Sequence, residues 1–254
     1  MLAVALSSCG TPQQKASAHE ENREAKVLLQ GIWLDDDTET ALLRVKGDTI
    51  YYADAATAPV AFKIIRDTLV TYGAQTNGYK IEKQGEHIFW FHSAVGDVIR
   101  MHKADDDIDS LSFVHNQEVP VYDEVIKKDS VVIYDNVRYR GYVYINPSKI
   151  KVMRPGVSEE GLGVDNVYYD NIIHICVYEG RKSLYAKDIT KQMFKGIVPE
   201  DFLQWAVLSD MDFHGVDAKG YHYQATVCIP DGASCYLVNI TAGKDGKLSY
   251  ELVK

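Results

Sequence analysis

The strongest constraint on the fold is a run of short segments between residues 31 and 103 in which apolar and polar side chains alternate. In residues 40–46, Ala41, Leu43 and Val45 share one face, as alternate residues of a strand do. Turn signals such as Asn-Gly and Gly-Asp separate the segments at intervals of about ten residues. No connection is long enough for the helix that joins parallel strands. The pattern predicts an antiparallel meander that closes into a barrel or half-barrel. After the first strand at Gly31, the segments are 40–46, 49–53, 60–65, 68–72, 79–83, 87–92 and 98–102.

The first segment opens with Gly31-Ile32-Trp33, directly after a short helix-compatible stretch. This motif resembles the Gly-x-Trp opening of lipocalin-type barrels. The resemblance implies a lipocalin-like topology in which Trp33 closes one end of the barrel. If the barrel is hollow, Trp33, Tyr52 and Trp90 line a cavity for a ligand. If it is filled, the same three side chains belong to its core.

The N-terminus carries a short lipidation motif, Leu6-Ser7-Ser8-Cys9-Gly10. An aliphatic residue and two small residues before a cysteine form a lipobox, although the apolar stretch before them is short and lacks the basic residues of a complete signal peptide. The motif predicts that residues 1–9 are a signal remnant and that Cys9 carries the lipid. The alternative is an ordinary N-terminus with a free cysteine. Residues 10–30 then form a polar tether and a short helix at 20–29.

The second half of the chain has longer apolar strands and two helical segments. Residues 31–115 are expected to form the first domain and residues 121–254 the second. Residues 167–178 are the most apolar strand, so we expect it to be central and covered on both sides. Pro199 and the acids after it predict a helix through Leu208. The fold class is mainly β, and the second domain is an α+β antiparallel sheet with one or two packed helices. The other expected elements are strands at 110–115, 131–134, 137–145, 221–229, 235–241 and 247–253, a loop at 156–163 and a helical segment at 188–194.

Strand and turn segments of the first domain carry a wider resemblance. They are Gly47-Asp48-Thr49-Ile50-Tyr51-Tyr52, Asp67-Thr68-Leu69, Tyr79-Lys80-Ile81-Glu82-Lys83-Gln84 and Phe89-Trp90-Phe91. With them the chain, over most of its length after Cys9, resembles a family of uncharacterised Bacteroidetes lipoproteins that carry a domain of unknown function. The resemblance implies a lipoprotein associated with the outer membrane. In that group, acidic residues soon after the lipidated cysteine accompany surface display; Thr11-Pro12-Gln13-Gln14-Lys15 has none, which indicates the periplasmic side.

Export would place the remaining cysteines in an oxidising compartment, where a disulfide between Cys228 and Cys235 can persist. A four-residue loop of residues 230–233 sets these cysteines opposite each other at a spacing suited to a bridge. A three-residue loop of residues 230–232 points their sulfur atoms to opposite faces. The sequence leaves both registers open, and with them the choice between a disulfide and two separate thiols.

Two groups of residues have the composition of a metal site without its spacing. Residues 105–109 begin like a calcium loop, yet Ser110 and Asn116 stand where glycine and a bidentate glutamate are needed. His174 and Cys176 share one strand face, but zinc needs three or four converging ligands. We therefore expect an acidic linker and core packing at these positions, and no metal or cofactor.

Composition and motifs also limit the function. A net charge of −9 and a sequence pI of about 5.4 disfavour nucleic acid, which requires clustered lysine and arginine. The sequence has no nucleophile elbow, zinc-protease motif, phosphate-binding loop or dinucleotide fingerprint. We expect a lipid-anchored protein of the cell envelope that binds or scaffolds without catalysis. Its expected partners are the membrane and a small apolar ligand, a glycan or an envelope protein. An inhibitor of a periplasmic hydrolase is the first alternative, and an enzyme with a site between the two halves is the second.

Overall fold

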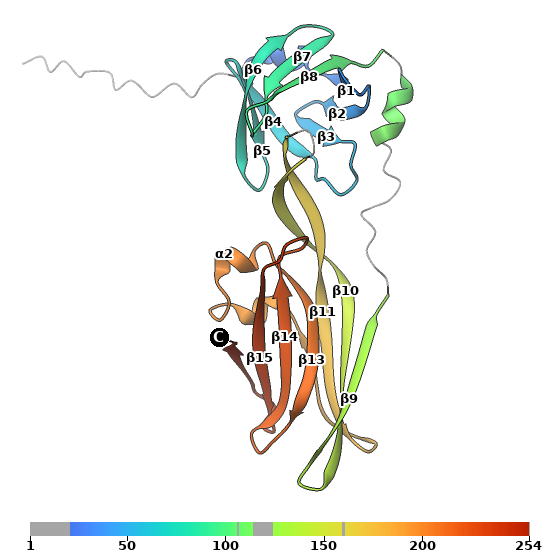
Figure 1. Cartoon of the computed structure of the whole chain (residues 1–254), viewed down its shortest axis with the longest axis vertical. Helices are drawn as coiled ribbons and strands as arrows, with labels where there is room; N and C mark the ends of the chain where they lie inside the picture. The colour runs from blue at the N-terminus through green and yellow to red at the C-terminus, as the bar shows by residue number, and fades with distance from the viewer. Residues whose placement is uncertain (1–20, 106, 114–123, 159–160, 254) are drawn as a thin grey trace, which may run out of the picture.

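The computed structural model describes residues 21–105, 107–113, 124–158 and 161–253. The chain forms two β-rich bodies, a barrel nearer the N-terminus and a sandwich nearer the C-terminus, and a long two-stranded hairpin runs between them (Figure 1). The fold is mainly β, as the sequence predicts. The predicted lipidation site at Cys9, the tether up to residue 20 and the predicted start of the second domain at residue 121 lie outside the described residues.

Eight antiparallel strands follow one another around the barrel in chain order, and pairing of the first with the last closes it. Each strand pairs with its neighbour in sequence, as the alternating pattern predicts. The Asn-Gly turn predicted at residues 77–78 is wrong, because both residues pair with the preceding strand and lie within the sixth strand. Helix α1 (Arg23–Leu28) precedes the barrel and begins after Asn22, whose side chain accepts a hydrogen bond from the Ala25 N–H. The strands are β1 (Gly31–Asp35), β2 (Ala41–Lys46), β3 (Thr49–Tyr52), β4 (Val60–Ile65), β5 (Thr68–Tyr72), β6 (Thr76–Gln84), β7 (Ile88–His92) and β8 (Val98–Lys103).

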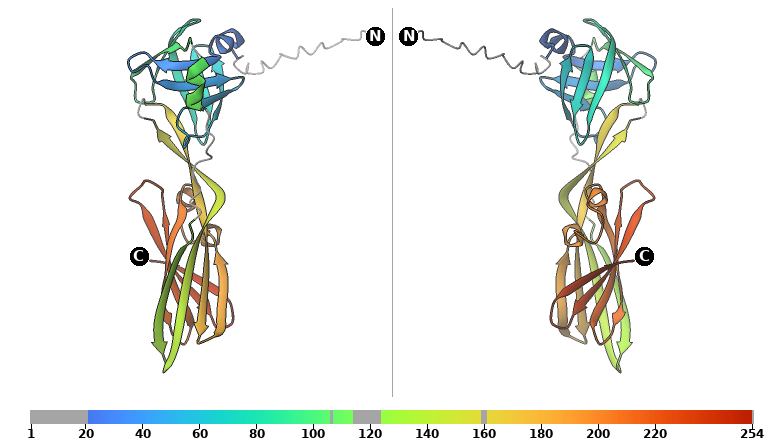
Figure 2. Two further views of the ribbon diagram at one scale, coloured as in Figure 1. Left: turned by 90° about the vertical axis from the view of Figure 1, so that its right-hand side faces the viewer. Right: turned by 90° about the vertical axis from the view of Figure 1, so that its left-hand side faces the viewer.

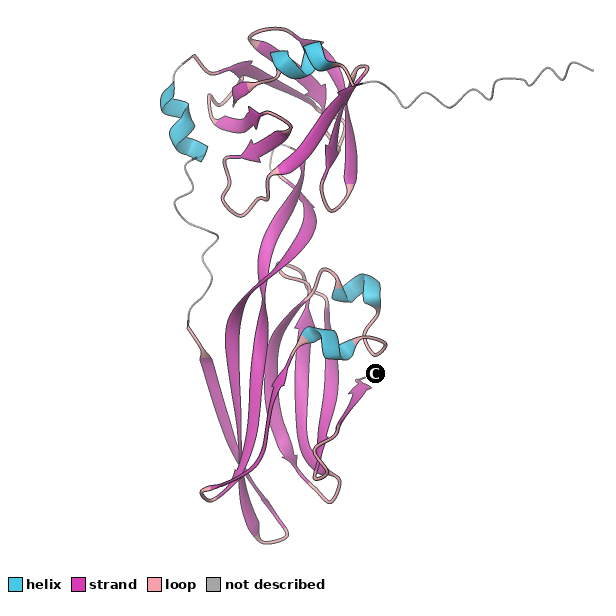
Figure 3. Cartoon of the chain, turned by 180° about the vertical axis from the view of Figure 1, so that it is seen from behind, coloured by secondary structure: helices cyan, strands magenta, loops and turns pink. Residues whose placement is uncertain are grey.

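Side chains fill the interior of the barrel. Phe62, Phe89 and Phe91 are fully buried there, and the ring centroids of Phe89 and Phe91 lie 5.3 Å apart. Helix α1 lies over one end of the barrel (Figure 3). Trp33 is buried, and its indole N–H donates at 2.8 Å to the carbonyl of Leu29, the residue after this helix. Packed aromatic rings occupy the volume that a ligand would need. The barrel is therefore filled.

Two four-stranded antiparallel sheets pack face to face in the sandwich, in the orders β12-β11-β10-β9 and β13-β14-β15-β16. Alternate residues point inward and form an aliphatic core that includes Val143, Ile175 and Val238. The strands are β9 (Ile126–Tyr134), β10 (Val137–Val157), β11 (Gly163–Glu179), β12 (Lys182–Ile189), β13 (Val207–Val216), β14 (Gly220–Cys228), β15 (Cys235–Gly243) and β16 (Leu248–Leu252). The short helices are the 3₁₀ turns η1 (Asp107–Phe113) and η2 (Lys191–Phe194) and the α-helix α2 (Glu200–Leu203).

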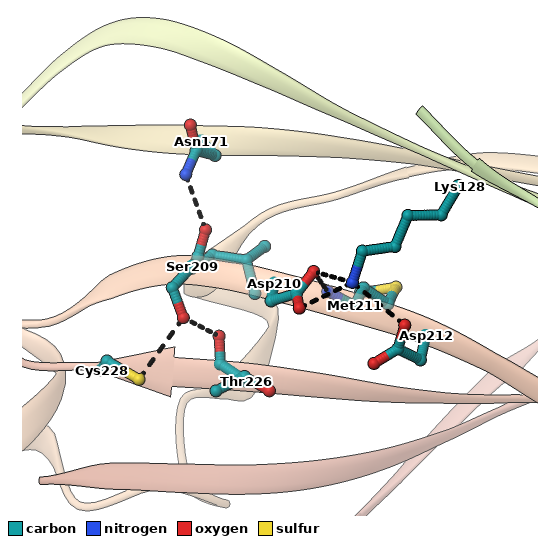
Figure 4. Close-up of polar contacts among 9 residues, drawn as sticks. Lys128, Asn171, Ser209, Asp210, Met211, Asp212, Thr226 and Cys228 are labelled. Carbon is teal, nitrogen blue, oxygen red and sulfur yellow. Dashed lines mark hydrogen bonds and ion pairs between the residues drawn. The ribbon is translucent and has the colours of Figure 1, made fainter. Parts of the chain in front are cut away.

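A lysine on the edge strand β9 links the two sheets. The Lys128 ammonium lies 2.6 Å from the Asp210 carboxylate and 3.0 Å from that of Asp212, both on β13 (Figure 4). A second link joins β11 to β13, where the Asn171 amide donates to the Leu208 carbonyl. Burial lowers the pKa of Lys128, but the bonds to the two carboxylates outweigh burial and raise it. A charged side chain that points inward also discourages an edge strand from pairing with another chain.

Strands β10 and β11 extend past the sandwich and reach the barrel (Figure 2). Strand β9 pairs with β10 only along residues 137–145, and β12 pairs with β11 only along residues 173–179. Beyond these residues, β10 and β11 pair only with each other within the sheet and form a ribbon. A shift in register between Pro147 and Lys151 marks the point at which the ribbon leaves the sandwich.

A buried ion pair fixes the base of this ribbon. The side chains of Asp170 and Lys191 are each 6% exposed, and their charged groups lie 3.7 Å apart. The Asp170 carboxylate accepts the Leu208 N–H at 2.8 Å, and the Lys191 ammonium donates to the Ala206 carbonyl. Burial lowers the pKa of Lys191, and Asp170 opposes this shift. These bonds tie β11 to the segment that precedes β13.

The sandwich differs from the sequence prediction in its helices. The helix predicted through Leu208 ends at Leu203, and Val207 already begins β13. Ala206 and Leu208 are buried in the sandwich core, and this burial outweighs the helical spacing of the segment. Only residues 191–194 of the segment predicted helical at 188–194 form a helical turn, because Asp188 belongs to β12.

Three further expectations need correction. The strand predicted at 110–115 is wrong, because residues 107–113 form η1. The predicted loop at 156–163 is shorter, since β10 continues to Val157 and β11 begins at Gly163. Strand β11 lies inside its sheet as predicted, but the second sheet covers only its inner face, and the His174 side chain on the outer face is exposed. Among the described residues, no helix is both long and apolar enough to cross a membrane.

Candidate functional site

The open end of the barrel receives the tip of the β10–β11 hairpin. Leu162 and Val164 are buried and belong to the same apolar core as the barrel side chains. Gly163 lies between them and donates its N–H to the Tyr79 hydroxyl at 2.9 Å. A Cβ atom on Gly163 would lie 2.7 Å from that hydroxyl, so a larger residue would push the hairpin away. The hairpin tip thus completes the barrel core.

Further hydrogen bonds hold the same tip to the loops of the barrel. The Val167 N–H donates to the Ala56 carbonyl at 2.8 Å, and the Ala58 N–H donates to the Asp165 carbonyl at 2.8 Å. The Asp165 carboxylate accepts the Ala74 N–H at 2.6 Å. These bonds reach the loop before β4 and the loop before β6. The hairpin is therefore held by two separate parts of the barrel rim.

A hollow of about 440 Å³ lies between the barrel rim and the hairpin. Its volume is in the range of sites that take small molecules. Both bodies contribute to its walls, which present polar and apolar surface in about equal parts. The residues that define it are Leu42, Tyr52 and Asp54 from the barrel and Val157, Leu162 and Val164 from the hairpin.

Burial raises the pKa of two tyrosines beneath the hairpin tip. Burial raises the pKa of the Tyr52 hydroxyl, and the nearby Tyr79 and Asp165 raise it further. Burial also raises the pKa of Tyr79, although its hydrogen bond with Gly163 opposes the shift. Both hydroxyls therefore stay protonated to a higher pH than an exposed tyrosine does.

The three side chains predicted to line one ligand cavity occupy three different places. Trp33 lies in the core of the barrel, and Tyr52 lies at its mouth. Trp90 lies on the outer surface, where the Lys83 ammonium is 4.6 Å from the centre of its ring. The prediction of a shared cavity is wrong, because the alternation in β7 that turns Phe89 inward turns Trp90 outward.

The chain contains a disulfide in the four-residue register. Cys228 and Cys235 face each other across β14 and β15, and their sulfur atoms are 2.06 Å apart. The Ile229 N–H donates to the Ser234 carbonyl and closes the loop. The thiol of Cys176 is free and buried, and burial raises its pKa. The disulfide joins two neighbouring strands of one sheet.

His174, which is expected to pack in the core, lies on the surface instead, because Ile173 and Ile175 take the inner positions of β11. A later histidine, His222, lies in a separate surface pair. His174 lies 2.6 Å from Asp188, and His222 lies 2.8 Å from Asp217. Within the described ranges, no group of three His, Cys, Asp or Glu residues lies close enough together to hold a metal ion. These contacts tie neighbouring strands and turns to one another.

Comparison with known protein families gives a match that covers the second body. A family model described as a domain of unknown function (DUF4738) matches residues 106–250, more than half of the chain. The chain belongs to this family. The DUF4738 match includes strands β9–β15 and the whole hairpin, and the eight barrel strands precede it. The hairpin that enters the barrel is therefore part of the DUF4738 domain. No curated protein matches the chain.

The sequence alone does not identify the residues that join the two bodies. The sequence predicts only a loop at 156–163, although this loop contains Gly161-Leu162-Gly163. An apolar residue between two glycines is a signal of close backbone approach to another surface. That signal indicates a contact, but it does not name the barrel as the partner.

Proposed function

We propose that this protein is a lipid-anchored component of the cell envelope that binds or scaffolds without catalysing a reaction. In this proposal Cys9 carries the lipid and the outer membrane holds it, as the resemblance to Bacteroidetes lipoproteins implies. Both bodies face the periplasm, because residues 11–15 lack the acidic side chains that accompany surface display in that group. The insertion of the hairpin tip into the barrel mouth carries the proposal. The barrel interior is packed with side chains and its mouth is covered by the hairpin. Such a barrel is better suited to a structural role than to carrying a ligand in its interior.

The placement of titratable side chains supports a role without catalysis. The pairs His102–Asp36, His174–Asp188 and His222–Asp217 lie on different strands, and each has partly exposed side chains. Catalytic groups are usually gathered in one cleft that excludes water. Dispersed surface pairs of this kind instead connect neighbouring strands and turns.

Inhibition of a periplasmic hydrolase is the second candidate function. The β9–β10 hairpin projects from the sandwich at the end away from the barrel (Figure 1). Its turn residues Asp135 and Asn136 have positive φ, and Ile133 beside the turn is 75% exposed. A stiff hairpin with an apolar side chain near its tip is suited to enter a cleft. Residual activity of cell-envelope hydrolases, measured with the wild type and with Ile133→Asp, tests this role; equal inhibition by both contradicts it.

Two measurements test the principal proposal. Mass spectrometry of the native protein is expected to find a mature chain that begins at Cys9 and carries acyl groups. A chain that begins at Met1 without an adduct contradicts the lipid anchor. The lipidated protein is then sedimented with purified cell-wall sacculi or outer-membrane vesicles, with a control that has neither. We expect sedimentation with one of them and no release of soluble fragments; sedimentation with neither contradicts the binding role.

A further inference from the structure

We propose that the hollow between the barrel mouth and the β10–β11 hairpin binds a small, neutral molecule that has an apolar part and a hydrogen-bonding group. This inference rests on the proposed binding role. It places the ligand at the joint between the two bodies, whereas the sequence predicts a ligand inside the barrel.

The aliphatic side chains of the hollow favour an apolar part in the ligand. Leu42, Leu162 and Val164 are buried side chains of the barrel core and also line the hollow. Val157 lies at the rim, where it is 56% exposed. An apolar group in the hollow would mainly cover Val157, because the other three side chains are at most 8% exposed. Removal of that apolar surface from water is the main source of binding free energy for such a ligand.

The charge of the hollow disfavours an anion. Asp54 is the one charged residue in the described lining, which has no lysine, arginine or histidine. The Asp54 carboxylate already accepts the Ala56 N–H at 2.9 Å and the Thr57 hydroxyl at 3.2 Å. A carboxylate or sulfonate bound here would lose water without gaining a countercharge. The amide of Asn166 and the hydroxyl of Ser158 can serve one neutral polar group.

A second hollow provides an internal control. It measures about 650 Å³ and lies at the base of the ribbon, between residues 150–153 of β10 and the α2 segment. Lys151, Lys195, Glu200 and Asp201 line it, so its walls are charged. An apolar neutral probe should therefore favour the hollow at the barrel mouth over this one.

Binding at the barrel mouth would also tighten the joint. Both bodies contribute walls, so the ligand binds only while the hairpin is seated in the barrel. A ligand that binds one state stabilises that state in proportion to its occupancy. The amides of Ala58 and Val167, which take part in bonds across the joint, should exchange more slowly when the ligand is bound.

The test uses two dyes that share one framework. N-phenyl-naphthylamine is neutral, apolar and has one N–H, whereas anilinonaphthalene sulfonate adds a negative charge. The full chain with Cys9→Ser, which lacks the lipid acceptor and needs no detergent, is titrated with each dye by fluorescence. We expect saturable one-to-one binding of the neutral dye and about tenfold weaker binding of the sulfonate, because its charge would be buried without a partner.

Matched variants locate the site. Val157 and Met153 both lie on β10, and they are 56% and 43% exposed, so each accepts a larger side chain without disturbing the core. Val157→Trp fills the hollow at the barrel mouth and should weaken binding of the neutral dye about tenfold by overpacking the site. Ala53→Trp, from the barrel side, should do the same. Met153→Trp projects into the charged hollow and should leave the affinity unchanged.

The outcomes separate this inference from the proposed function. Absence of saturable binding of the neutral dye overturns the inference, as does equal binding of both dyes or equal weakening by Val157→Trp and Met153→Trp. The lipid adduct and the sedimentation with envelope material are measured independently on the lipidated protein. If those results hold while the dye does not bind, the ligand site is wrong and the envelope role stands.

Discussion

The barrel and the sandwich both bury antiparallel strands, but they differ in where their core residues come from. The barrel closes on itself and leaves no unpaired edge, yet its core includes Leu162 and Val164 from the hairpin of the other body. The described residues of the sandwich core all lie in the second body. The barrel therefore depends on the second body for part of its core, whereas the sandwich core does not depend on the barrel. The DUF4738 match has the same boundary, because it includes the hairpin and leaves out the barrel.

Two matched core substitutions, one in each body, test this difference with the largest expected effect. Phe89 in the barrel and Phe194 in the sandwich are both fully buried. Phe89→Ala should cost about 3–5 kcal/mol and destabilise the barrel alone, because the sandwich takes nothing from it. Phe194→Ala should cost a similar amount and weaken both bodies, since the barrel needs the hairpin. Hydrogen exchange at increasing urea, read on peptides from each body, measures the two stabilities.

The result that would contradict one-way dependence is a Phe89→Ala variant in which the sandwich loses as much stability as the barrel. That outcome would show that the two bodies unfold as one cooperative unit in both directions.

The next largest effect is expected at the base of the ribbon. Asp170→Ala removes the partner of the buried Lys191 ammonium and the acceptor of the Leu208 N–H. The cost should be about 3 kcal/mol, because a buried charge is left unpaired. Asp188→Ala is the control, since that carboxylate is exposed and should contribute little. Urea unfolding of both variants provides the measurement, and equal midpoints would show that the buried pair does not stabilise the ribbon.

A smaller effect is expected from the disulfide. The double variant Cys228→Ser and Cys235→Ser opens a link between residues seven positions apart. A loop this short should cost about 2–3 kcal/mol through the entropy of the unfolded chain. The loss should appear in the sandwich first, and calorimetry should show the barrel unchanged until the sandwich unfolds. Reduction of the wild type without a shift of the transition would contradict this expectation.

At alkaline pH both bodies should lose stability for the same reason. Burial raises the pKa of Tyr52 in the barrel and of Tyr223 in the sandwich above the ordinary value of 10.0. The unfolded chain releases these protons near pH 10 while the folded chain retains them, so the stability present below pH about 10 is lost as the pH rises above it. Tyr52→Phe should reduce this loss in the barrel, and Tyr223→Phe should reduce it in the sandwich.

Urea midpoints of each body between pH about 9 and about 11 measure the effect as a slope, which separates titration from any constant loss of packing. We expect each variant to flatten the slope of the urea midpoint against pH in its own body and to leave the slope of the other body unchanged. An unchanged slope in both variants would show that these two hydroxyls titrate alike in the folded and unfolded chains.

The barrel was predictable because its information is local. Every barrel strand pairs with the next one, so alternation and turn residues within about ten residues suffice. The pattern does not determine which face points inward, and the assignment of Trp90 to a cavity is wrong because Phe89 and Phe91 occupy the inner positions beside it. Alternation defines two faces, but the rest of the barrel decides which one is buried.

The ribbon and β13 were not predictable in the same way. Residues beyond 145 in β10 are supported by β11 and by a barrel that lies far away in the sequence. The segment around Val207 has helical spacing, but burial against the other sheet makes it a strand. The disulfide requires a loop of four residues and not three, and the sequence leaves both registers open. In each case the deciding contact is distant in the chain.

Native-state hydrogen exchange of the hairpin tip tests the central claim most directly. If the tip is locked into the barrel, the amides of Gly163 and Val167 should exchange as slowly as those of barrel strands such as β7. Gly163→Val should speed exchange at the tip and leave Ile175 in the sandwich core unchanged, because the added side chain meets only the barrel rim. Exchange of both wild-type tip amides at the rate of an exposed loop would contradict the account.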